Sequence, residues 1–301
     1  MAKKCLVTGG AGFIGSNLVD ALIERGNEVI IIDNLSTGKK ENINHKAKFI
    51  LADIRNLEEI KPHFAGADYV FHLAALARVQ PSIADPKTYN EVNVSGTLNV
   101  LIAAKDAGVK KVVYSASSSA YGNQEKMPLT EDMPAHPLSP YGLQKYIGEL
   151  YCRMFWDVYQ FQTVCIRYFN VYGNRQSLEG AYAPVIGIFA RQKLAGEPLS
   201  IVGDGEQGRD YTNVSDVVRA NILASESDKA FKGESINIGR GQSFSVKEVV
   251  AMIGGPVINL PARLEPKMSL ADNSLARNLL DWDPKVNLPE WLEVYKKELG
   301  I

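Results

Sequence analysis

The sequence lacks a surplus of either charge. Its 33 lysines and arginines nearly balance 34 aspartates and glutamates, which leaves a formal net charge of −1. Such a chain has no overall attraction for nucleic acid or for an anionic membrane, so we expect neither as a partner. It also lacks any apolar run of about 18 residues, the length that a membrane helix needs. MAKKCLVTGG leads into a strand without an apolar signal region, so we expect a cytoplasmic protein.

Cysteine is scarce as well. The three cysteines, Cys5, Cys152 and Cys165, are an odd number, lie in apolar surroundings and form no C-x-x-C pair. We therefore expect buried, reduced thiols, with no disulfide and no metal site.

The 301 residues are 46% apolar and 22% charged, the composition of a globular protein with a sizeable core. Short β-branched runs alternate with longer amphipathic ones up to about residue 172, a pattern that predicts right-handed crossovers and a parallel sheet covered on both faces. We expect an α/β, Rossmann-type doubly wound fold over residues 1–172. Residues 173–301 mix Gly and Pro loops with short elements and predict a smaller, loop-rich lobe, with room for the chain to cross back between the two.

A glycine-rich turn joins the expected strand CLVTG to the expected helix SNLVDALIERG. Gly9, Gly12 and Gly15 stand where a dinucleotide-binding turn needs glycine, and the helix N-terminus would face the phosphates. Asp33 ends the next strand, 18 residues past Gly15, where a carboxylate would accept the ribose hydroxyls. The residues after Asp33 include no arginine for a 2′-phosphate, which favours NAD over NADP. Asp53 and Ile54 either flank the adenine or form an ordinary strand-end turn.

Tyr141 and Lys145 stand four residues apart in the segment PYGLQK, and Ser117 lies 24 positions before Tyr141. Positions i and i+4 share one face of a helix, so the phenol and the ammonium can address the same object. A lone Tyr-x-x-x-Lys pair is expected by chance, and its meaning depends on its context.

The segments TGGAGFIG, HLAAL, SASSSAYG, PYGLQK, RYFNVYG and GRDYTNVSD occur in that order. With them the chain resembles the extended short-chain dehydrogenase/reductases, and within these the UDP-hexose 4-epimerases. The resemblance implies NAD in the N-terminal domain, a UDP-sugar held by the C-terminal lobe, and a homodimer formed through two long helices per subunit. Burial of those helices under the chain's own C-terminal lobe is the alternative.

The resemblance also assigns residues. The catalytic set would be Ser117, Tyr141 and Lys145. NAD would be contacted by Gly9, Gly12, Phe13, Ile14, Asp33, Asn34, Ser36, Thr37, Gly38, Asp53, Ile54, Leu73, Ala74, Ala75, Asn93, Ser115, Tyr141, Lys145 and Tyr168. The UDP-sugar would be contacted by Ala77, Ser117, Ser118, Ser119, Tyr141, Asn170, Ala183, Val185, Ser200, Arg209, Arg263, Glu265 and Ser269. The chain departs from the family pattern at PARLEPKMSLAD, which is about one residue short, and at Arg78, which either faces the sugar or is a solvated surface arginine.

The implied chemistry is inversion at C4 of a UDP-hexose through a transient 4-keto sugar. A tyrosine is a poor base at neutral pH, but Lys145 and the nicotinamide ring would favour its phenolate. Ser269, the residue expected to face the C2 substituent, is small, so we expect UDP-GlcNAc and UDP-GalNAc to be accepted alongside UDP-Glc and UDP-Gal. A packing role for Ser269 would leave an enzyme restricted to the plain hexoses.

Two further alternatives remain. Nucleotide-sugar 4,6-dehydratases carry Asp-Glu where this chain has Ser118 and Ser119, and the decarboxylating branch carries a Glu in the same segment. Neither serine replaces an acid and a base for eliminating water. A non-catalytic NAD-sensing regulator could share the fold, but such proteins lose the tyrosine or the lysine that this chain keeps.

Overall fold

The structure is a computed structural model that describes residues 2–178, 183–262 and 266–301. Its main feature is a seven-stranded sheet in the order β11-β6-β5-β4-β1-β2-β3, in which all neighbouring strands are parallel. The expected doubly wound parallel sheet is confirmed. The strands are β1 (Lys4–Thr8), β2 (Glu28–Asp33), β3 (Lys48–Leu51), β4 (Tyr69–His72), β5 (Lys111–Ser117), β6 (Thr163–Tyr168) and β11 (Lys232–Ile238).

Helices cover both faces of this sheet, so its central strands are buried on both sides. One face packs against α1 (Phe13–Glu24), α8 (Val214–Glu226) and α10 (Ser274–Leu280). The other face packs against α2 (Leu57–Ile60), α5 (Gly96–Asp106) and α6 (Pro140–Tyr159). Cys5, Cys152 and Cys165 lie buried and unpaired in these two layers, as expected.

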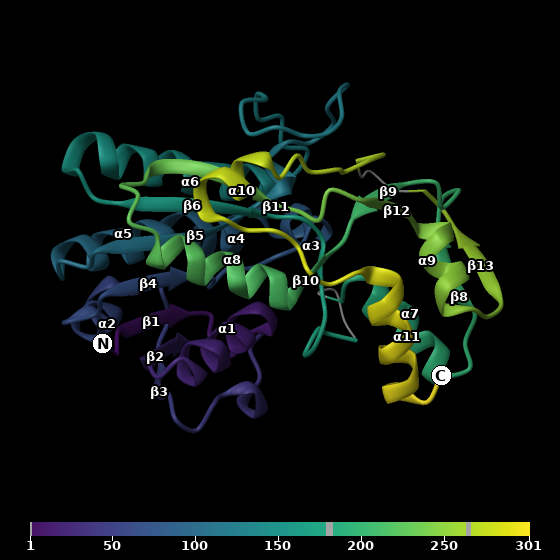
Figure 1. Cartoon of the computed structure of the whole chain (residues 1–301), viewed down its shortest axis with the longest axis horizontal. Coiled ribbons are helices and arrows are strands. Elements are labelled where there is room, and N and C mark those ends of the chain that lie inside the picture. Colours follow the sequence, from purple (N-terminus) through teal and green to yellow (C-terminus); the bar gives the residue numbers. More distant parts are fainter. Residues whose placement is uncertain (1, 179–182, 263–265) are drawn as a thin grey trace.

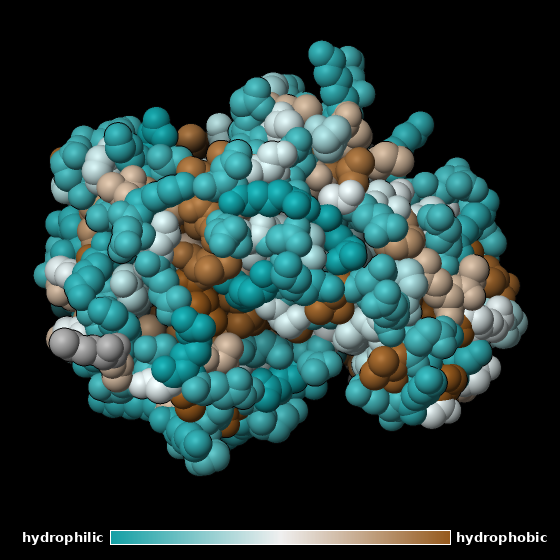
Figure 2. Space-filling view, in the orientation of Figure 1, coloured by the Kyte–Doolittle hydropathy of each residue, from teal (hydrophilic) through white to brown (hydrophobic). Residues whose placement is uncertain are grey.

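A smaller lobe stands beside the sheet and carries the C-terminus (Figure 1). It has a core of its own, to which Phe189, Leu199, Val249 and Leu288 belong. The lobe and its connections comprise β7 (Val171–Tyr172), α7 (Val185–Leu194), β8 (Leu199–Val202), β9 (Gly208–Asp210), β10 (Thr212–Asn213), β12 (Ser243–Ser245), α9 (Val246–Ile253), β13 (Val257–Leu260) and α11 (Leu288–Leu299). Figure 2 shows the two parts as mostly hydrophilic surfaces with a notch between them.

The chain crosses between the two parts more than once. After residue 173 it returns to form α8, β11 and α10, and β11 pairs with β6 at the edge of the large sheet. Residues 173–301 therefore contribute to both parts. The physical reason is that Lys232–Ile238 completes the sheet by pairing with a strand more than sixty residues away, at Ile236↔Ile166 and its neighbours.

Short helices occupy the loops that follow β2 to β5. They are η1 (Lys40–Asn42), η2 (Lys61–Phe64), α3 (Val79–Ala84), α4 (Pro86–Asn90), a π-helical turn (Glu91–Ser95) and η4 (Ser118–Ala120). The single helix expected over EVNVSGTLNVLIAAKDAG thus begins as a π-helical turn and continues as α5. Within the described residues, no helix combines the length and apolarity needed to cross a membrane.

Candidate active site

A cavity of about 680 Å³ opens at the carboxyl ends of the parallel strands. Its walls come from the segments that follow β1, β2, β3, β4, β5 and β6, and from the loops of the smaller lobe that face them. This edge of a doubly wound sheet is where such folds hold their ligands.

The glycine turn after β1 forms one wall of the cavity. Gly9 has a φ of 73° and lies so close to the next loop that a Cβ there would sit 2.6 Å from the Ala74 amide nitrogen. A Cβ on Gly15 would sit 2.1 Å from the Gly9 carbonyl oxygen. Both positions therefore require glycine, the first for its backbone angle and both for the close approach.

The N-terminus of α1 opens into the same cavity, because Gly12, Phe13, Ile14 and Gly15 all line it. Gly12 provides no side-chain cap, and the first turn of α1 carries no acidic residue. A helix start of this kind presents N–H groups and positive potential to an anion.

Asp33 ends β2 and is buried against the turn. Its two carboxylate oxygens accept hydrogen bonds from the Ala11 amide at 3.0 Å and the Leu35 amide at 2.8 Å. Burial raises the pKa of Asp33, and the two amide hydrogen bonds oppose that rise. Each ionised oxygen keeps capacity for one more donor, so the carboxylate can still accept ribose hydroxyls. The glycine cradle, the open helix start and this carboxylate fit a dinucleotide such as NAD.

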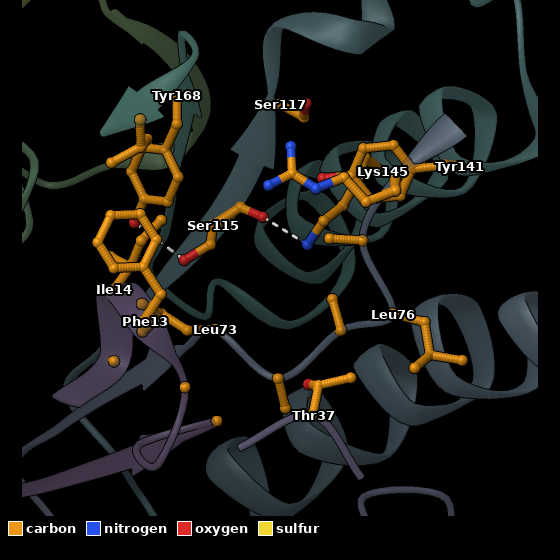
Figure 3. A pocket seen from close by; sticks show the side chains of 18 of the residues that line it. Phe13, Ile14, Thr37, Leu73, Leu76, Ser115, Ser117, Tyr141, Lys145 and Tyr168 are labelled. Carbon is orange, nitrogen blue, oxygen red and sulfur yellow. Dashed lines mark hydrogen bonds between the residues drawn. The ribbon is translucent and has the colours of Figure 1, made fainter. Parts of the chain in front are cut away.

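Ser115, Lys145 and Tyr168 are linked deeper in the cavity (Figure 3). The Lys145 ammonium donates to the Ser115 carbonyl oxygen at 2.7 Å and lies 4.8 Å from the centre of the Tyr114 ring. The Ser115 hydroxyl and the Tyr168 hydroxyl are 2.9 Å apart. Burial lowers the pKa of Lys145 to about 8. The ammonium is thus fixed in place by backbone that belongs to β5.

Tyr141 lies in the first turn of α6, where Ser139 caps the helix by accepting from the Gly142 amide at 3.1 Å. Tyr141 and Ser117 both line this part of the cavity (Figure 3). Burial raises the pKa of the Tyr141 phenol, whereas the hydrogen bond with Ser117 and the charge of Arg78 lower it. Arg78 is half-buried and lines the cavity, so it is not a solvated surface arginine.

The opposite wall of the cavity joins β6 to the smaller lobe. The Asn170 amide donates to the Asp210 carbonyl oxygen at 2.9 Å and to the Ser269 hydroxyl at 3.1 Å. Ser269 is buried and lines the cavity together with Asn170 and Arg209. The Asp210 carboxylate accepts three backbone N–H bonds, from Arg240, Gly241 and Ala271, and so fixes two loops behind this wall.

Most of the expected site residues lie in this one cavity. Those that line it are Gly9, Gly12, Phe13, Ile14, Asp33, Asn34, Ser36, Thr37, Asp53, Ile54, Leu73, Ala74, Ala75, Ala77, Ser115, Ser117, Ser118, Ser119, Tyr141, Lys145, Tyr168, Asn170, Arg209 and Ser269. Arg263 and Glu265 lie outside the described residues.

Five other expected residues do not line the cavity; they are Gly38, Asn93, Ala183, Val185 and Ser200. Gly38 packs directly on Asp33, since a Cβ there would sit 2.9 Å from a carboxylate oxygen. Asn93 is buried and hydrogen-bonded to the backbone of Leu76. Ser200 is hydrogen-bonded to the side chain of Gln192.

Some lining residues were not expected from the sequence, among them Lys39, Asn42, Val92, Arg175 and Met268. They belong to loops whose path a local pattern does not predict. His72 was also missed, although it supports the turn: its two ring nitrogens lie 2.7 Å from the Thr8 hydroxyl and 2.9 Å from the Thr97 hydroxyl. Its position as the last residue of a buried strand was the available signal.

Residues 5–239 match the model of the NAD dependent epimerase/dehydratase family. A putative UDP-glucose 4-epimerase of Methanocaldococcus jannaschii is 40% identical over 297 residues, which cover 96% of this chain and 95% of that protein.

Two solved structures are similar over nearly their whole length. The UDP-glucose 4-epimerase of Thermotoga maritima with UDP-glucose has a TM-score of 0.93 at 41% identity, over 98% of this chain and 99% of that one. The UDP-N-acetylglucosamine 4-epimerase of Methanobrevibacter ruminantium with UDP-N-acetylmuramic acid has a TM-score of 0.92 at 39% identity, over 99% of this chain and 97% of that one.

Proposed function

The chain belongs to the NAD dependent epimerase/dehydratase family, and we propose that it is a UDP-sugar 4-epimerase with NAD as its cofactor. The observation that carries the proposal is the meeting of Ser117, Tyr141 and Lys145 in the cavity that the glycine turn and Asp33 also line. The similar enzymes named above, one of them with UDP-glucose bound, support the reaction type.

The chain's own residues handle the proton of the C4 hydroxyl. Tyr141 takes that proton as the general base, and Ser117 holds the C4 oxygen or passes the proton to the phenol. Lys145, fixed by the Ser115 carbonyl, favours the phenolate and holds the nicotinamide ribose. NAD, when bound, would supply the acceptor and donor of the C4 hydride. Tyr141 then gives the proton back.

The nucleotide is anchored on the opposite wall. Arg209 would pair with the diphosphate, since a guanidinium makes strong, directional bonds to phosphate oxygens. Asn170 would contact the sugar nucleotide beside it. A firm diphosphate anchor with few sugar contacts suits a reaction in which the keto sugar must turn over within the site.

The charges of the cavity favour an epimerase over a dehydratase. Among the described lining residues, the only carboxylates are Asp33 and Asp53, at the ends of β2 and β3. Tyr141 and Ser117 lie at the β5 side, separated from β2 by β4 and β1. Ser118 and Ser119 occupy the positions that would need an acid and a base, so the described wall offers no pair for eliminating water.

The proposed substrates include the acetylated sugars. Ser269 is small, lines the cavity and accepts a hydrogen bond from the Asn170 amide at 3.1 Å. A small residue there leaves room for an acetamido group at C2, so UDP-GlcNAc and UDP-GalNAc would be converted as well as UDP-Glc and UDP-Gal.

The test is direct. The protein is incubated separately with UDP-Glc, UDP-Gal, UDP-GlcNAc and UDP-GalNAc, and the products are identified by NMR. Interconversion within each pair, without net NADH, supports the proposal. A 4-keto-6-deoxy product would make the chain a dehydratase, and no turnover of any sugar would favour a sensor. Conversion of UDP-Gal but not UDP-GalNAc would restrict the enzyme to plain hexoses.

We also propose a homodimer formed through α5 and α6, which lie side by side on one face of the sheet (Figure 1). On α6, Leu143, Leu150 and Val158 are 47%, 50% and 62% exposed, and their spacing puts them on one outward face. A second copy of the same face would cover them. Sedimentation velocity should show a dimer for the wild type and a monomer for Leu150→Glu; a monomeric wild type would contradict the proposal.

A further inference from the structure

Arg78 has an unusual backbone for a residue with a side chain. Its φ is 100° and its ψ is 139°, a conformation that L-residues rarely adopt. Such a conformation persists only where the surrounding structure imposes it, and it is most often found at functional sites. Arg78 immediately precedes α3 and lines the cavity beside the Tyr141 wall.

The two residues before Arg78 are held by side chains from other elements. The Asn93 side chain accepts a hydrogen bond from the Leu76 N–H and donates one to the Leu76 carbonyl oxygen, each at 2.9 Å. The Tyr89 hydroxyl donates to the Ala77 carbonyl at 3.0 Å. The loop is therefore fixed before Arg78 is reached.

On the other side of Arg78, Val79 is connected to the backbone of Tyr141 through the side chain of Ser82. The Ser82 hydroxyl donates to the Val79 carbonyl at 2.6 Å and accepts from the Tyr141 amide at 3.1 Å. One hydroxyl thus joins the helix that follows Arg78 to the helix that carries Tyr141. These hydrogen bonds fix the backbone next to Arg78 relative to the backbone of Tyr141. Such a fixed placement of a charged residue near a reacting group is a form of preorganisation.

The ionisable groups around this pair are Tyr89 on α4, Tyr114 on β5 and Lys145 on α6. No described carboxylate lines this end of the cavity. Lys145 already donates to the Ser115 carbonyl, and burial lowers its pKa to about 8, so its charge is partly lost in mildly alkaline solution. A guanidinium keeps its charge throughout this range.

We propose that Arg78 is a positioning residue for the catalytic base, and that its guanidinium, together with Lys145, favours the ionised form of the Tyr141 phenol. The inference rests on the proposed function, in which Tyr141 takes the C4 proton. The charge of Arg78 lowers the pKa of Tyr141, in line with this role. Arg78 acts through Tyr141 and takes no proton itself.

The test compares Arg78→Gly, which adopts a φ of 100° without strain, with the charge-preserving Arg78→Lys. Removing the charge should move the acidic limb of the kcat profile up by roughly one pH unit, the low end of what a nearby opposite charge produces. Below that limb, turnover should fall about tenfold, while Arg78→Lys should recover most of the loss. The melting temperature of Arg78→Gly should not fall, because glycine removes the backbone strain.

A second readout does not need turnover. The near-ultraviolet absorbance of tyrosinate is titrated in wild type and in Arg78→Gly, each against the same protein carrying Tyr141→Phe, so that the difference reports Tyr141 alone. The phenol should ionise at higher pH in Arg78→Gly. If the wild type epimerises no UDP-sugar, the proposed function fails while this titration still decides the role of Arg78.

Two results would overturn the inference. One is a pH profile and a Tyr141 titration that coincide in wild type and Arg78→Gly. The other is an unchanged profile for neutral sugars with a selective loss of turnover of a UDP-hexuronate, which would make Arg78 a reader of substrate charge. Arg78→Asn, also tolerated at positive φ, repeats the test if Arg78→Gly loosens the loop.

Discussion

Replacing Asp33 by asparagine should remove the preference for NAD over NADP. In the structure both carboxylate oxygens are engaged, one by the Ala11 amide at 3.0 Å and the other by the Leu35 amide at 2.8 Å. An asparagine has only one acceptor oxygen, so one of these amides would face an NH₂ group. The ribose hydroxyls would also lose a charged acceptor.

The magnitude follows from these bonds. A hydrogen bond to a charged group contributes about 1.5 to 3 kcal/mol. A loss of about 2 kcal/mol weakens NAD binding roughly 30-fold. NADP should gain relative to NAD, because the charge that repels its 2′-phosphate is gone. A wild-type preference for NAD of at least ~30-fold should therefore shrink to a few-fold in Asp33→Asn.

The assay is calorimetric titration of NAD and NADP into protein freed of bound nucleotide. Asp53→Asn is the matched control: Asp53 lines the same cavity, but its carboxylate is already paired with Arg55 at 2.8 Å and bonded to Asn34 at 2.9 Å. It should leave the ratio of the two affinities unchanged. Equal affinities in the wild type, or the same loss of preference in Asp53→Asn, would refute the role given to Asp33.

Three further changes test other parts of the account. Ser269→Tyr should abolish turnover of the acetylated sugars and spare UDP-Gal, because its ring would fill the space next to C2 in the cavity that Ser269 lines. Ser269→Ala, which stays small, should convert both kinds of sugar. Equal losses of turnover for both kinds in Ser269→Tyr would contradict the role given to Ser269. Burial lowers the pKa of His72 to about 3 from 6.5, so stability is lost as the pH falls below 6.5. Between pH 6.5 and about pH 5, the free energy of unfolding measured in urea should fall by about 2 kcal/mol more in the wild type than in His72→Gln. The same dependence of this free energy on pH in both proteins would contradict the prediction. Gly15→Ala should weaken NAD binding and cost roughly 1 to 3 kcal/mol from its clash with the Gly9 carbonyl. Gly26→Ala, which meets nothing within 4 Å but has a φ of 81°, should carry only the cost of that backbone angle and leave NAD binding unchanged.

The sequence predicts what local chemistry requires. The glycine turn and Asp33 follow from short-range spacing around two strands, and the structure brings them into one cavity. The spacing of Tyr141 and Lys145 predicts that both lie on one face of a helix, which is α6. Ser117 ends β5, and the structure places all three residues in the cavity.

The remaining features depend on contacts between distant segments. The pairing of β11 with β6 is not visible in KGESINI, since a short strand does not specify its partner. The backbone around Arg78 is held by Asn93 and Tyr89, which lie on later segments, and by Ser82 of α3 itself. The bonds of the buried Asn93 amide to the Leu76 backbone also join segments that no local pattern connects.

The most direct test of the central claim is turnover by Tyr141→Phe, measured together with its affinity for NAD and for UDP. The phenyl ring preserves shape but cannot accept a proton. Both affinities should stay close to those of the wild type, while kcat for UDP-Gal should fall by roughly a hundredfold or more, the contribution of a general base. A Tyr141→Phe enzyme that interconverts UDP-Gal and UDP-Glc at near the wild-type rate would contradict the account.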